Sequence, residues 1–315
     1  MKASPHKRLL LLLAALCILL GVGAVLYYPA QELMTRIQRN REIQQFQHAV
    51  AEGEAKAVEQ AASGQAQVAY PELLERMQEY NRQLFETGHS GLKDAFSYTQ
   101  SAFDLQQWGI PSEVIGVLKI PAMGEELPVY LGATQENLSR GVAVLGQTSM
   151  PVGGLNTNCV IAGHRGWMGN AFFREIESLE KGDAVYLTTY WGEKTYRVVD
   201  ISIILPDDTQ AIKTQAGREL LTLLTCHPYT VGTHRYVVYC EAERTQVEPP
   251  ETSEAPTEPV TAPEPNPTSA ADTICPTTQV ADDSVRRIQL ERWLPFLAVP
   301  LLILAAVVLL WPRKK

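Results

Sequence analysis

Basic residues are scarce in this chain of 315 residues. Lysine and arginine together number 27 against 35 aspartates and glutamates, which gives a formal net charge of −8. A protein that binds nucleic acid through the phosphates needs the opposite balance, so the composition argues against that class of partner. Much of the acidity lies in residues 245–285, where no basic residue occurs. The net charge therefore says little about the folded part of the chain.

Cysteine is also rare, and its number is odd. Of the five cysteines, Cys17 lies in an apolar run and Cys275 in a polar, proline-rich segment. The remaining three, Cys159, Cys226 and Cys240, cannot all pair, so the folded part keeps a free thiol. Cys159 and Cys240 lie inside strand patterns, which is typical of small buried thiols. Cys226 ends an apolar run just before turn-forming residues, and packing alone does not explain that position.

Charge is absent from two long apolar runs, residues 9–28 and 293–311. Each run is close to the ~20 residues that a membrane-spanning helix needs. A cleaved signal peptide is the alternative for the first run, but its apolar region usually has only about 7–15 residues before a small-residue cleavage site. Tyr27-Tyr28-Pro29 does not fit such a site. We therefore predict two membrane-spanning helices.

Basic residues flank the outer ends of both runs, in residues 1–8 and 312–315. The positive-inside rule then places both termini in the cytoplasm and the middle of the chain outside. Arginines also follow the first run and precede the second, so the charge signal is mixed. Two spans nevertheless require both termini to lie on one side of the membrane.

The regions between the two spans differ in composition. Residues 29–113 are largely polar and helix-prone, and PELLERMQEYNRQLFE at 71–86 places apolar side chains on one side of a helix. A simple membrane-proximal stalk is the alternative for this region. Residues 245–285 are rich in Pro, Glu, Thr and Ser and cannot bury enough apolar surface to fold. We predict that they form a disordered tether.

Residues 114–244 contain eight short runs of β-forming residues: VIGVLKI, PVYLG, VAVLG, NCVIAG, AVYLTTYW, KTYRVVDISIIL, LLTLLTC and RYVVYCEA. Gly, Pro, Asn or Asp bound most of them, as in all-β domains. A closed barrel is the economical way to hide the edges of eight short strands. We predict one helix within this all-β domain, over NAFFREIESL at 170–179.

Cys226 is a candidate nucleophile, and a thiol of ordinary pKa needs a neighbouring base or cation to become a thiolate. His227 is adjacent in sequence, so its side chain should point away from Cys226 in an extended strand. His234 follows the turn and stays a candidate on spacing. His164, in AGHRG, lies at the end of a strand as Cys226 does. A structural or solvent-exposed histidine is the alternative for His164.

Arg235 opens the strand that follows Cys226. The intervening connection, residues 227–234, allows the two strands to pair and their ends to meet. A fixed guanidinium there can stabilise the oxyanion of an acyl-transfer reaction. An ordinary surface arginine at the start of a strand is the alternative.

These residues resemble the sortase family. LLTLLTC is similar to the T-L-x-T-C signature of sortases, THRYVV to the arginine strand that follows it, and AGHRG to the histidine loop. IGVLKIPAMGEELPVYLG, LGQTSMPVGG, FFREIESLEKGD and IILPDD extend the resemblance, in the family's order, over about residues 114–243. The pattern is most similar to class C, the pilin-polymerising sortases. It implies an eight-stranded sortase barrel with His164, Cys226 and Arg235 as the catalytic set.

Class C sortases also carry a lid before the barrel, usually Asp-Pro followed by an aromatic residue. This chain has Asp94-Ala95-Phe96 there, so the resemblance implies that Asp94 pairs with an active-site arginine and that Phe96 caps the thiol. Alanine in place of proline leaves the lid backbone less fixed. A connecting loop whose phenylalanine packs on the barrel is the alternative.

The resemblance implies a membrane-anchored transpeptidase on the outer face of a Gram-positive cytoplasmic membrane, with no metal or other cofactor. Cys226 would cleave a Leu-Pro-x-Thr-Gly-like sorting signal after threonine, and a pilin lysine would resolve the acyl-enzyme. The partners would be sorting-signal-bearing surface or pilin proteins. The alternatives are a sortase that anchors proteins to a peptidoglycan precursor, a non-catalytic membrane-tethered binding module, and a peptidase that hydrolyses its acyl-enzyme.

Overall fold

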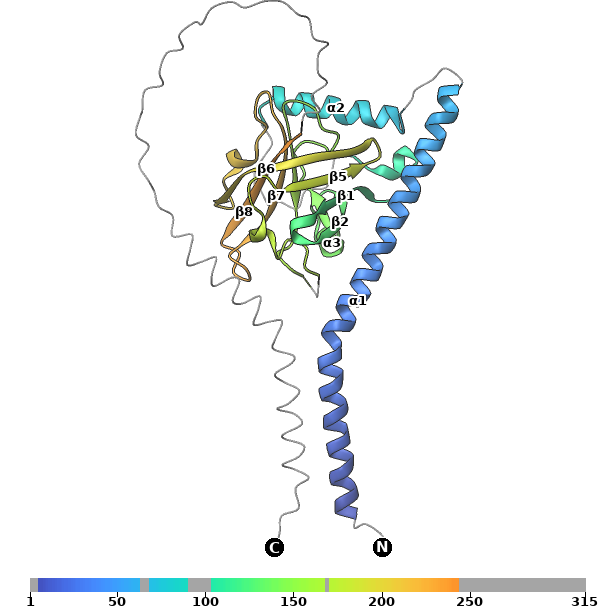
Figure 1. The fold of residues 1–315 in the computed structure, drawn as a ribbon, viewed down its shortest axis with the longest axis vertical. Helices are drawn as coiled ribbons and strands as arrows, with labels where there is room; N and C mark the ends of the chain where they lie inside the picture. The colour runs from blue at the N-terminus through green and yellow to red at the C-terminus, as the bar shows by residue number, and fades with distance from the viewer. Residues whose placement is uncertain (1–4, 63–67, 90–102, 168–169, 244–315) are drawn as a thin grey trace, which may run out of the picture.

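The computed structural model describes residues 5–62, 68–89, 103–167 and 170–243. In these residues a closed β-barrel lies beside one long helix, and a shorter helix crosses one end of the barrel (Figure 1). Three predicted segments lie outside the described residues: the candidate lid at 94–96, the tether at 245–285 and the apolar run at 293–311.

The long helix, α1 (Pro5–Ala62), is continuous over 58 residues and contains Pro29 in its interior. It joins the first predicted membrane run and the helix-prone polar residues that follow into one uninterrupted helix. Among the described residues, no helix is both long and apolar enough to span a bilayer. Farther along α1, Ile43, Phe46 and Ala49 are buried and belong to the core.

Helix α2 (Pro71–Glu86) has the bounds expected from the sequence. Pro71 occupies its first turn, where a missing N–H costs nothing. Leu73 and Met77 are buried, one helical turn apart. Asn81, a turn farther on, is also buried: its Nδ2 donates to the Met150 carbonyl at 3.1 Å and its Oδ1 accepts from the Met150 N–H at 2.7 Å. These two bonds fix α2 to the loop that precedes β4.

The eight predicted strands all form, and they close into a barrel in the order β1-β2-β3-β4-β7-β8-β6-β5. Their bounds are β1 Val114–Ile120, β2 Glu125–Leu131, β3 Val142–Val144, β4 Thr157–Ala162, β5 Ala184–Thr189, β6 Gly192–Ile204, β7 Glu219–His227 and β8 His234–Ala242. Closure leaves no open sheet edge, which confirms the prediction of an eight-stranded barrel.

The helical elements around the barrel are short: α3 (Gln135–Arg140) and the 3-10 helices η1 (Leu105–Trp108), η2 (Pro121–Met123), η3 (Ile176–Ser178) and η4 (Thr209–Ile212). The helix predicted over 170–179 was wrong, because only η3 forms there. Phe172 has a φ of 45°, which a right-handed helix excludes, and the Ile176 N–H donates to the Phe173 carbonyl in a three-residue turn. Burial of both phenylalanines overrides the helical pattern of the sequence.

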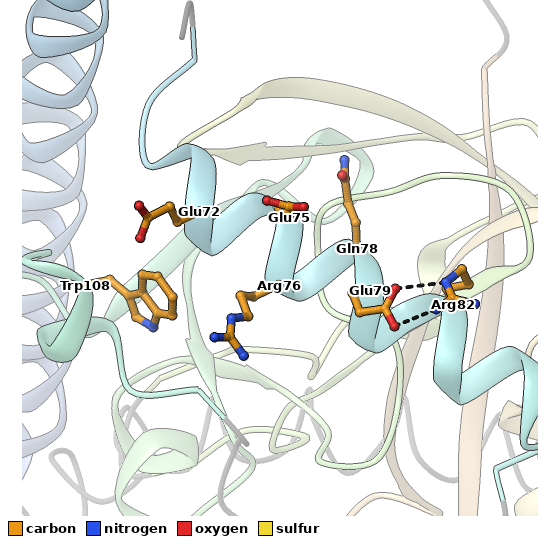
Figure 2. Close-up of a pocket in the computed structure, with 7 residues that line it drawn as sticks. All are labelled: Glu72, Glu75, Arg76, Gln78, Glu79, Arg82 and Trp108. Atoms are coloured by element: carbon orange, nitrogen blue, oxygen red, sulfur yellow. Dashed lines mark hydrogen bonds and ion pairs between the residues drawn. The ribbon is translucent and has the colours of Figure 1, made fainter. Parts of the chain in front are cut away.

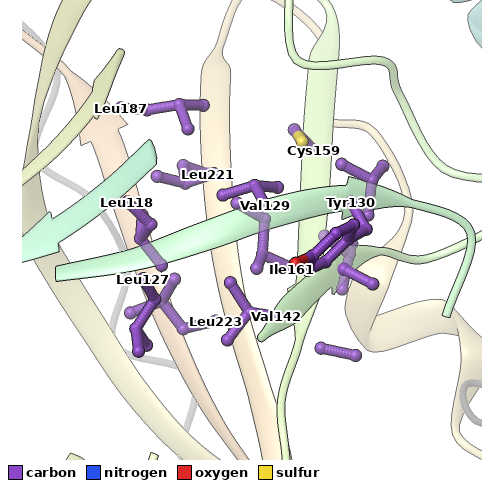
Figure 3. Close-up of a cluster of buried hydrophobic side chains, with 14 of the residues drawn as sticks. Leu118, Leu127, Val129, Tyr130, Val142, Cys159, Ile161, Leu187, Leu221 and Leu223 are labelled. Atoms are coloured by element: carbon purple, nitrogen blue, oxygen red, sulfur yellow. The ribbon is translucent and has the colours of Figure 1, made fainter. Parts of the chain in front are cut away.

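Apolar side chains fill the barrel, and Figure 3 shows Cys159 among them. Cys240 belongs to the same core. Cys159 on β4 and Cys240 on β8 are both buried. Burial raises the pKa of the Cys159 thiol far above its ordinary value and that of the Cys240 thiol to about 12. Neither thiol ionises at physiological pH, which confirms that both serve as packing residues.

Candidate active site

Three neighbouring strands bring the three predicted site residues to one rim of the barrel. Strands β4 and β7 run parallel, with Ala162 opposite Leu224, so His164 and Cys226 each lie two residues farther toward the same rim. Strands β7 and β8 run antiparallel, and Cys226 lies directly opposite Arg235. The order across the rim is therefore histidine, cysteine, arginine.

Two hydrogen bonds hold the histidine loop against β7 beyond the end of β4. The Gly163 N–H donates to the Leu224 carbonyl at 3.1 Å. The Thr225 hydroxyl, which is buried, donates to the Gly163 carbonyl at 2.7 Å. Thr225 and Gly163 immediately precede Cys226 and His164, so these bonds fix the relative height of the thiol and the imidazole.

The Cys226 thiol is half-buried, and the loop after β7 lies against it. Burial raises the pKa of Cys226, while the positive charges of Arg235 and Arg165 oppose that rise. Gly232 of the loop has a φ of 72°, and a β-carbon added there would lie 3.8 Å from the Cys226 Sγ. Any side chain at Gly232 would be strained and would crowd the approach to the thiol.

His164 is also half-buried, and its ring stacks on Trp167 with a centroid separation of 4.8 Å and an interplanar angle of 18°. Burial lowers the pKa of His164, so the imidazole is neutral near pH 7. Its Nε2 is buried and has no hydrogen-bond partner among the described residues. A neutral imidazole with an uncommitted nitrogen is suited to accept a proton.

Arg235 lies at the corner where the loop becomes β8. Its Nη1 donates to the carbonyls of Gly232 and His234, both at 2.9 Å. These bonds hold the guanidinium close to its own backbone, opposite Cys226. Its charge favours the Cys226 thiolate, as the effect on the thiol pKa shows.

The other two histidines considered in the sequence have different surroundings. His227 is buried, and its Nδ1 lies 2.8 Å from Arg165 Nη1 and 3.2 Å from Glu177 Oε1. His234 lies opposite His227 in the β7–β8 pair, and its Nδ1 is 3.0 Å from the hydroxyl of Thr233. His227 is thus engaged in a separate buried cluster, as expected for a side chain next to Cys226 in a strand.

Sequence reasoning did not single out Arg165 and Glu177. Arg165 Nη2 and Glu177 Oε1 are 2.5 Å apart, and the exposed fractions of their side chains are only 2% and 13%. Burial raises the pKa of Glu177, but the contacts with His227 and Arg165 outweigh it and lower that pKa overall. Arg165 stands in the AGHRG motif beside His164. Glu177 was not recognisable, because it lies in the segment that was expected to be a helix, residues 170–179.

A large hollow lies elsewhere, along the outer side of α2 (Figure 2). It measures about 680 Å³ and is lined by Glu72, Glu75, Arg76, Gln78, Glu79, Arg82 and Trp108. None of these is a predicted site residue. Glu79 and Arg82 within it pair with each other at 2.6 Å, and the lining holds three glutamates against two arginines, so it carries no strong charge of one sign. The candidate lid residues Asp94 and Phe96 lie outside the described residues.

Comparisons with known proteins agree with this geometry. A family model described as a sortase domain matches residues 118–243. Sortase D of Bacillus subtilis (strain 168) is 37% identical over 127 residues, 39% of this chain and 61% of that protein. Sortase A of Bacillus anthracis is 34% identical over 126 residues, 40% of this chain and 58% of that protein. The chain spans less than two thirds of the length of these curated relatives.

A solved structure of sortase C1 from GBS pilus island 1 is also similar. It aligns with a TM-score of 0.56 and 28% identity, over 68% of this chain and 96% of that one. The alignment extends well beyond the 126-residue family match. The likeness therefore includes elements that precede the barrel.

Proposed function

We propose that this chain, which belongs to the sortase family and is most like its class C members, is a cysteine transpeptidase. Its proposed reaction is the assembly of pilin subunits. The observation that carries the proposal is the strand register. It places Cys226 opposite Arg235 across β7 and β8, and it carries His164 to the same rim on β4. Nucleophile, base and cation are the three roles that thioester-forming acyl transfer requires.

In the acylation step, Cys226 Sγ attacks the carbonyl carbon of threonine in a Leu-Pro-x-Thr-Gly-like signal. The thiol proton passes to His164, whose Nε2 has no other partner among the described residues. Arg235 stabilises the negative charge that forms on the carbonyl oxygen. The C–N bond then breaks, His164 returns the proton to the leaving glycine amine, and a thioester remains on Cys226.

In the second step, the ε-amine of a pilin lysine attacks the thioester carbonyl. His164 removes a proton from that amine, the C–S bond breaks and the thiol of Cys226 is restored. An isopeptide bond joins the two subunits. The two pKa shifts favour a neutral resting pair, because burial raises the pKa of Cys226 and lowers that of His164. The ion pair that attacks is then the minor protonation state.

The peptidoglycan-anchoring reaction is the second candidate. The curated relatives are a sortase D and a sortase A rather than a sortase C, so the matched sequence does not select the acceptor amine. The structural similarity to sortase C1 of a pilus island favours the pilin acceptor. Only the amine of the second step differs between the two candidates.

The proposed location is the outer face of a Gram-positive cytoplasmic membrane, with residues 9–28 and 293–311 as the two spans. The absence of charge in both runs supports it. Tethering suits the reaction, because both substrates are themselves held at the membrane before transfer.

The test uses the full chain in detergent micelles, with sorting-signal peptides and candidate pilin domains. Mass spectrometry scores the thioester and the isopeptide product. We expect both with the wild-type chain and with Cys17→Ala, and neither with Cys226→Ala. An isopeptide bond to a pilin lysine supports polymerisation, and transfer only to wall-type amines supports anchoring.

Two other results would contradict transpeptidation. Release of the cleaved peptide into water regardless of added amine would identify a peptidase. The absence of any thioester with every peptide, in Asp94→Ala and Phe96→Ala variants as well as the wild-type chain, would favour a binding module.

A further inference from the structure

A buried charged cluster lies next to the proposed catalytic residues without belonging to them. Arg165, Glu177 and His227 contact one another at 2.5, 2.8 and 3.2 Å. Tyr236 borders the cluster, with its ring centroid 5.6 Å from that of His227 and 5.9 Å from the Arg165 guanidinium carbon. We refer to these four residues as the anchor cluster.

Each of three anchor residues directly follows a proposed catalytic residue in sequence. Arg165 follows His164, His227 follows Cys226 and Tyr236 follows Arg235. In β7 and β8, neighbouring side chains point to opposite sides, so fixing His227 or Tyr236 also fixes the direction of the residue before it. Arg165 lies in the loop beyond β4, where its buried ion pair restrains the backbone next to His164. The cluster therefore repeats, on the buried side, the three-residue arrangement of the rim.

Glu177 is the fourth member, and it comes from a different part of the chain. Its Oε1 contacts both Arg165 and His227. Arg165 Nη1 at 2.8 Å and Glu177 Oε1 at 3.2 Å both lie next to His227 Nδ1, so the three side chains meet at this ring nitrogen. Glu177 balances the arginine charge and fixes the orientation of the guanidinium toward the histidine ring.

The cluster is poorly built for stability alone. Arg165 Nε and Glu177 Oε2 are buried and have no hydrogen-bond partner among the described residues. Buried charges cost desolvation energy, and apolar side chains of similar volume often replace them without loss of stability. Buried charged atoms without partners next to the candidate site are better explained by the position that the cluster imposes on the neighbouring rim residues than by a gain in stability.

We propose that Arg165, Glu177 and His227 are positioning residues that align His164 and Cys226, and through Tyr236 also Arg235, for acyl transfer. This inference rests on the proposed transpeptidase function. The side chains of Arg165, Glu177 and His227 are only 2%, 13% and 4% exposed, so the proposal gives them no contact with the substrate. Their loss should therefore slow the chemical step without weakening substrate binding, since a displacement of about 1 Å can slow a reaction by about 10²-fold.

The first experiment compares Glu177→Gln with Glu219→Gln in the full chain. Glu219 is a matched control, because its side chain is 14% exposed, it pairs with Lys194 at 2.7 Å, and it lies at the other end of β7. We expect Glu177→Gln to lower the single-turnover acylation rate at least about tenfold, with KM within about threefold of wild type. Glu219→Gln should acylate at the wild-type rate.

Alkylation of Cys226 by iodoacetamide separates misalignment from unfolding. This displacement of iodide needs only the thiolate and not the aligned set. We expect Glu177→Gln to alkylate at least as fast as wild type, because Arg165 then acts on the thiol without the opposing carboxylate. Acylation at the wild-type rate in Glu177→Gln would overturn the proposal, and so would an equal loss of acylation in both glutamine variants.

His227 provides an independent test if Glu177→Gln does not fold. His227→Asn keeps a polar side-chain group near the position of Nδ1, beside Arg165 and Glu177, whereas His227→Leu does not. Retention of acylation within about threefold in the asparagine variant, with a loss of about tenfold or more in the leucine variant, supports positioning. Equal rates in the two variants would contradict it.

Failure of the transpeptidase proposal would be recognised separately. If wild type forms no acyl-enzyme, the imidazole NMR signals of His164 still report on the cluster. They should shift or broaden in Glu177→Gln and stay unchanged in Glu219→Gln. Unchanged His164 signals in both variants would reject the anchor cluster, whatever reaction the protein catalyses.

Discussion

Two buried ionic clusters, each centred on a glutamate, join distant parts of this chain, and they differ in how completely they are bonded. Glu42 of α1 accepts from the Tyr130 hydroxyl and from two nitrogens of Arg140, at 3.1 and 2.9 Å, and Arg140 also pairs with Glu113 at 2.6 Å. Glu177 makes its contacts through one oxygen, and its other oxygen has no partner among the described residues. The bonding of the Glu42 cluster favours a role in the stability of the fold. The bonding of the Glu177 cluster favours the proposed role in positioning the residues at the rim.

The comparison predicts that substitutions in the two clusters have opposite signatures. Loss of the Glu42 cluster should lower the free energy of unfolding and leave the chemistry at Cys226 unchanged. Loss of groups at the rim or beneath it should change the chemistry more than the stability.

Arg235→Gln should lower the acylation rate by about 10²- to 10³-fold, because in the proposed mechanism it removes the cation that stabilises the oxyanion. It should also move the pH profile of Cys226 alkylation to higher pH, since Arg235 opposes the burial that raises the thiol pKa. Stopped-flow alkylation between pH 7 and 10.5 measures the shift. Arg218→Gln is the control, because Arg218 immediately precedes β7 and pairs with Glu241 of β8 at 2.8 Å, at the end of these strands away from Cys226. An identical pH profile in Arg235→Gln and wild type would contradict the assignment.

Glu42→Ala should lower the free energy of unfolding by about 3 kcal/mol, because it leaves the Tyr130 hydroxyl and two Arg140 donors without their carboxylate. Urea denaturation measures the loss, and iodoacetamide should still alkylate Cys226 at the wild-type rate. Glu32→Ala is the matched control on the same helix. Its ion pair with Arg36 is exposed, so its loss should change stability by less than about 1 kcal/mol. Slower alkylation in Glu42→Ala would show that α1 also acts on the site.

Trp167→Ala should slow acylation by about threefold to tenfold, since the stack that orients the His164 ring is worth roughly 1 kcal/mol. It should also raise the pKa of His164 toward its ordinary value, because removing the indole admits water to a ring whose burial lowers that pKa. NMR titration of the imidazole measures the shift. Trp167→Phe keeps an aromatic face and should behave more like wild type. A His164 pKa that does not rise in Trp167→Ala would show that other groups bury the ring.

Glu177→Gln should make stability less sensitive to acid. The folded-state pKa of Glu177 lies below the ordinary value of 4.5, so its stabilising contribution is present above that value and is lost as the pH falls through the folded-state pKa. The difference in unfolding free energy between wild type and Glu177→Gln should therefore shrink between pH 6 and pH 3. Urea denaturation across that range measures it. If the difference in unfolding free energy stays constant across this pH range, the ionisation of Glu177 contributes nothing to stability.

The sequence predicted the strands and α2 well because their signals are local. Each strand is a short run of β-forming residues bounded by turn residues, and α2 begins at a proline and has a clear apolar side. The same reasoning failed at 170–179, where burial of Phe172 and Phe173 between the barrel and its loops overrides a helical pattern. That override depends on tertiary packing, which no local window contains.

The three candidate catalytic residues could be predicted from the sequence because they lie at the ends of strands. Cys226, His164 and Arg235 each stand where a β pattern meets a turn, and the register then brings them to one rim. The anchor cluster was not predictable, because its contacts join the end of β7 to Glu177 some 50 residues earlier in the chain. Arg165 and His227 read as ordinary neighbours of the motif residues until the fold places Glu177 between them.

The continuity of α1 also sets a length. At about 1.5 Å per residue, a helix of 58 residues is about 87 Å long, and the 14 residues from Tyr28 to Glu42 account for about 21 Å of it. If residues 9–28 lie in the membrane, as proposed, the Glu42 cluster fixes the height of the barrel above the bilayer and its rotation about the axis of α1. Both depend on the number of residues between Tyr28 and Glu42. Two residues inserted between them would turn the barrel by about 200° about the helix axis, whereas seven would lift it by about 10 Å with nearly the same face presented. In the proposed membrane arrangement, the number of residues in this segment would therefore set how far from the bilayer, and in which direction, the rim can meet a substrate.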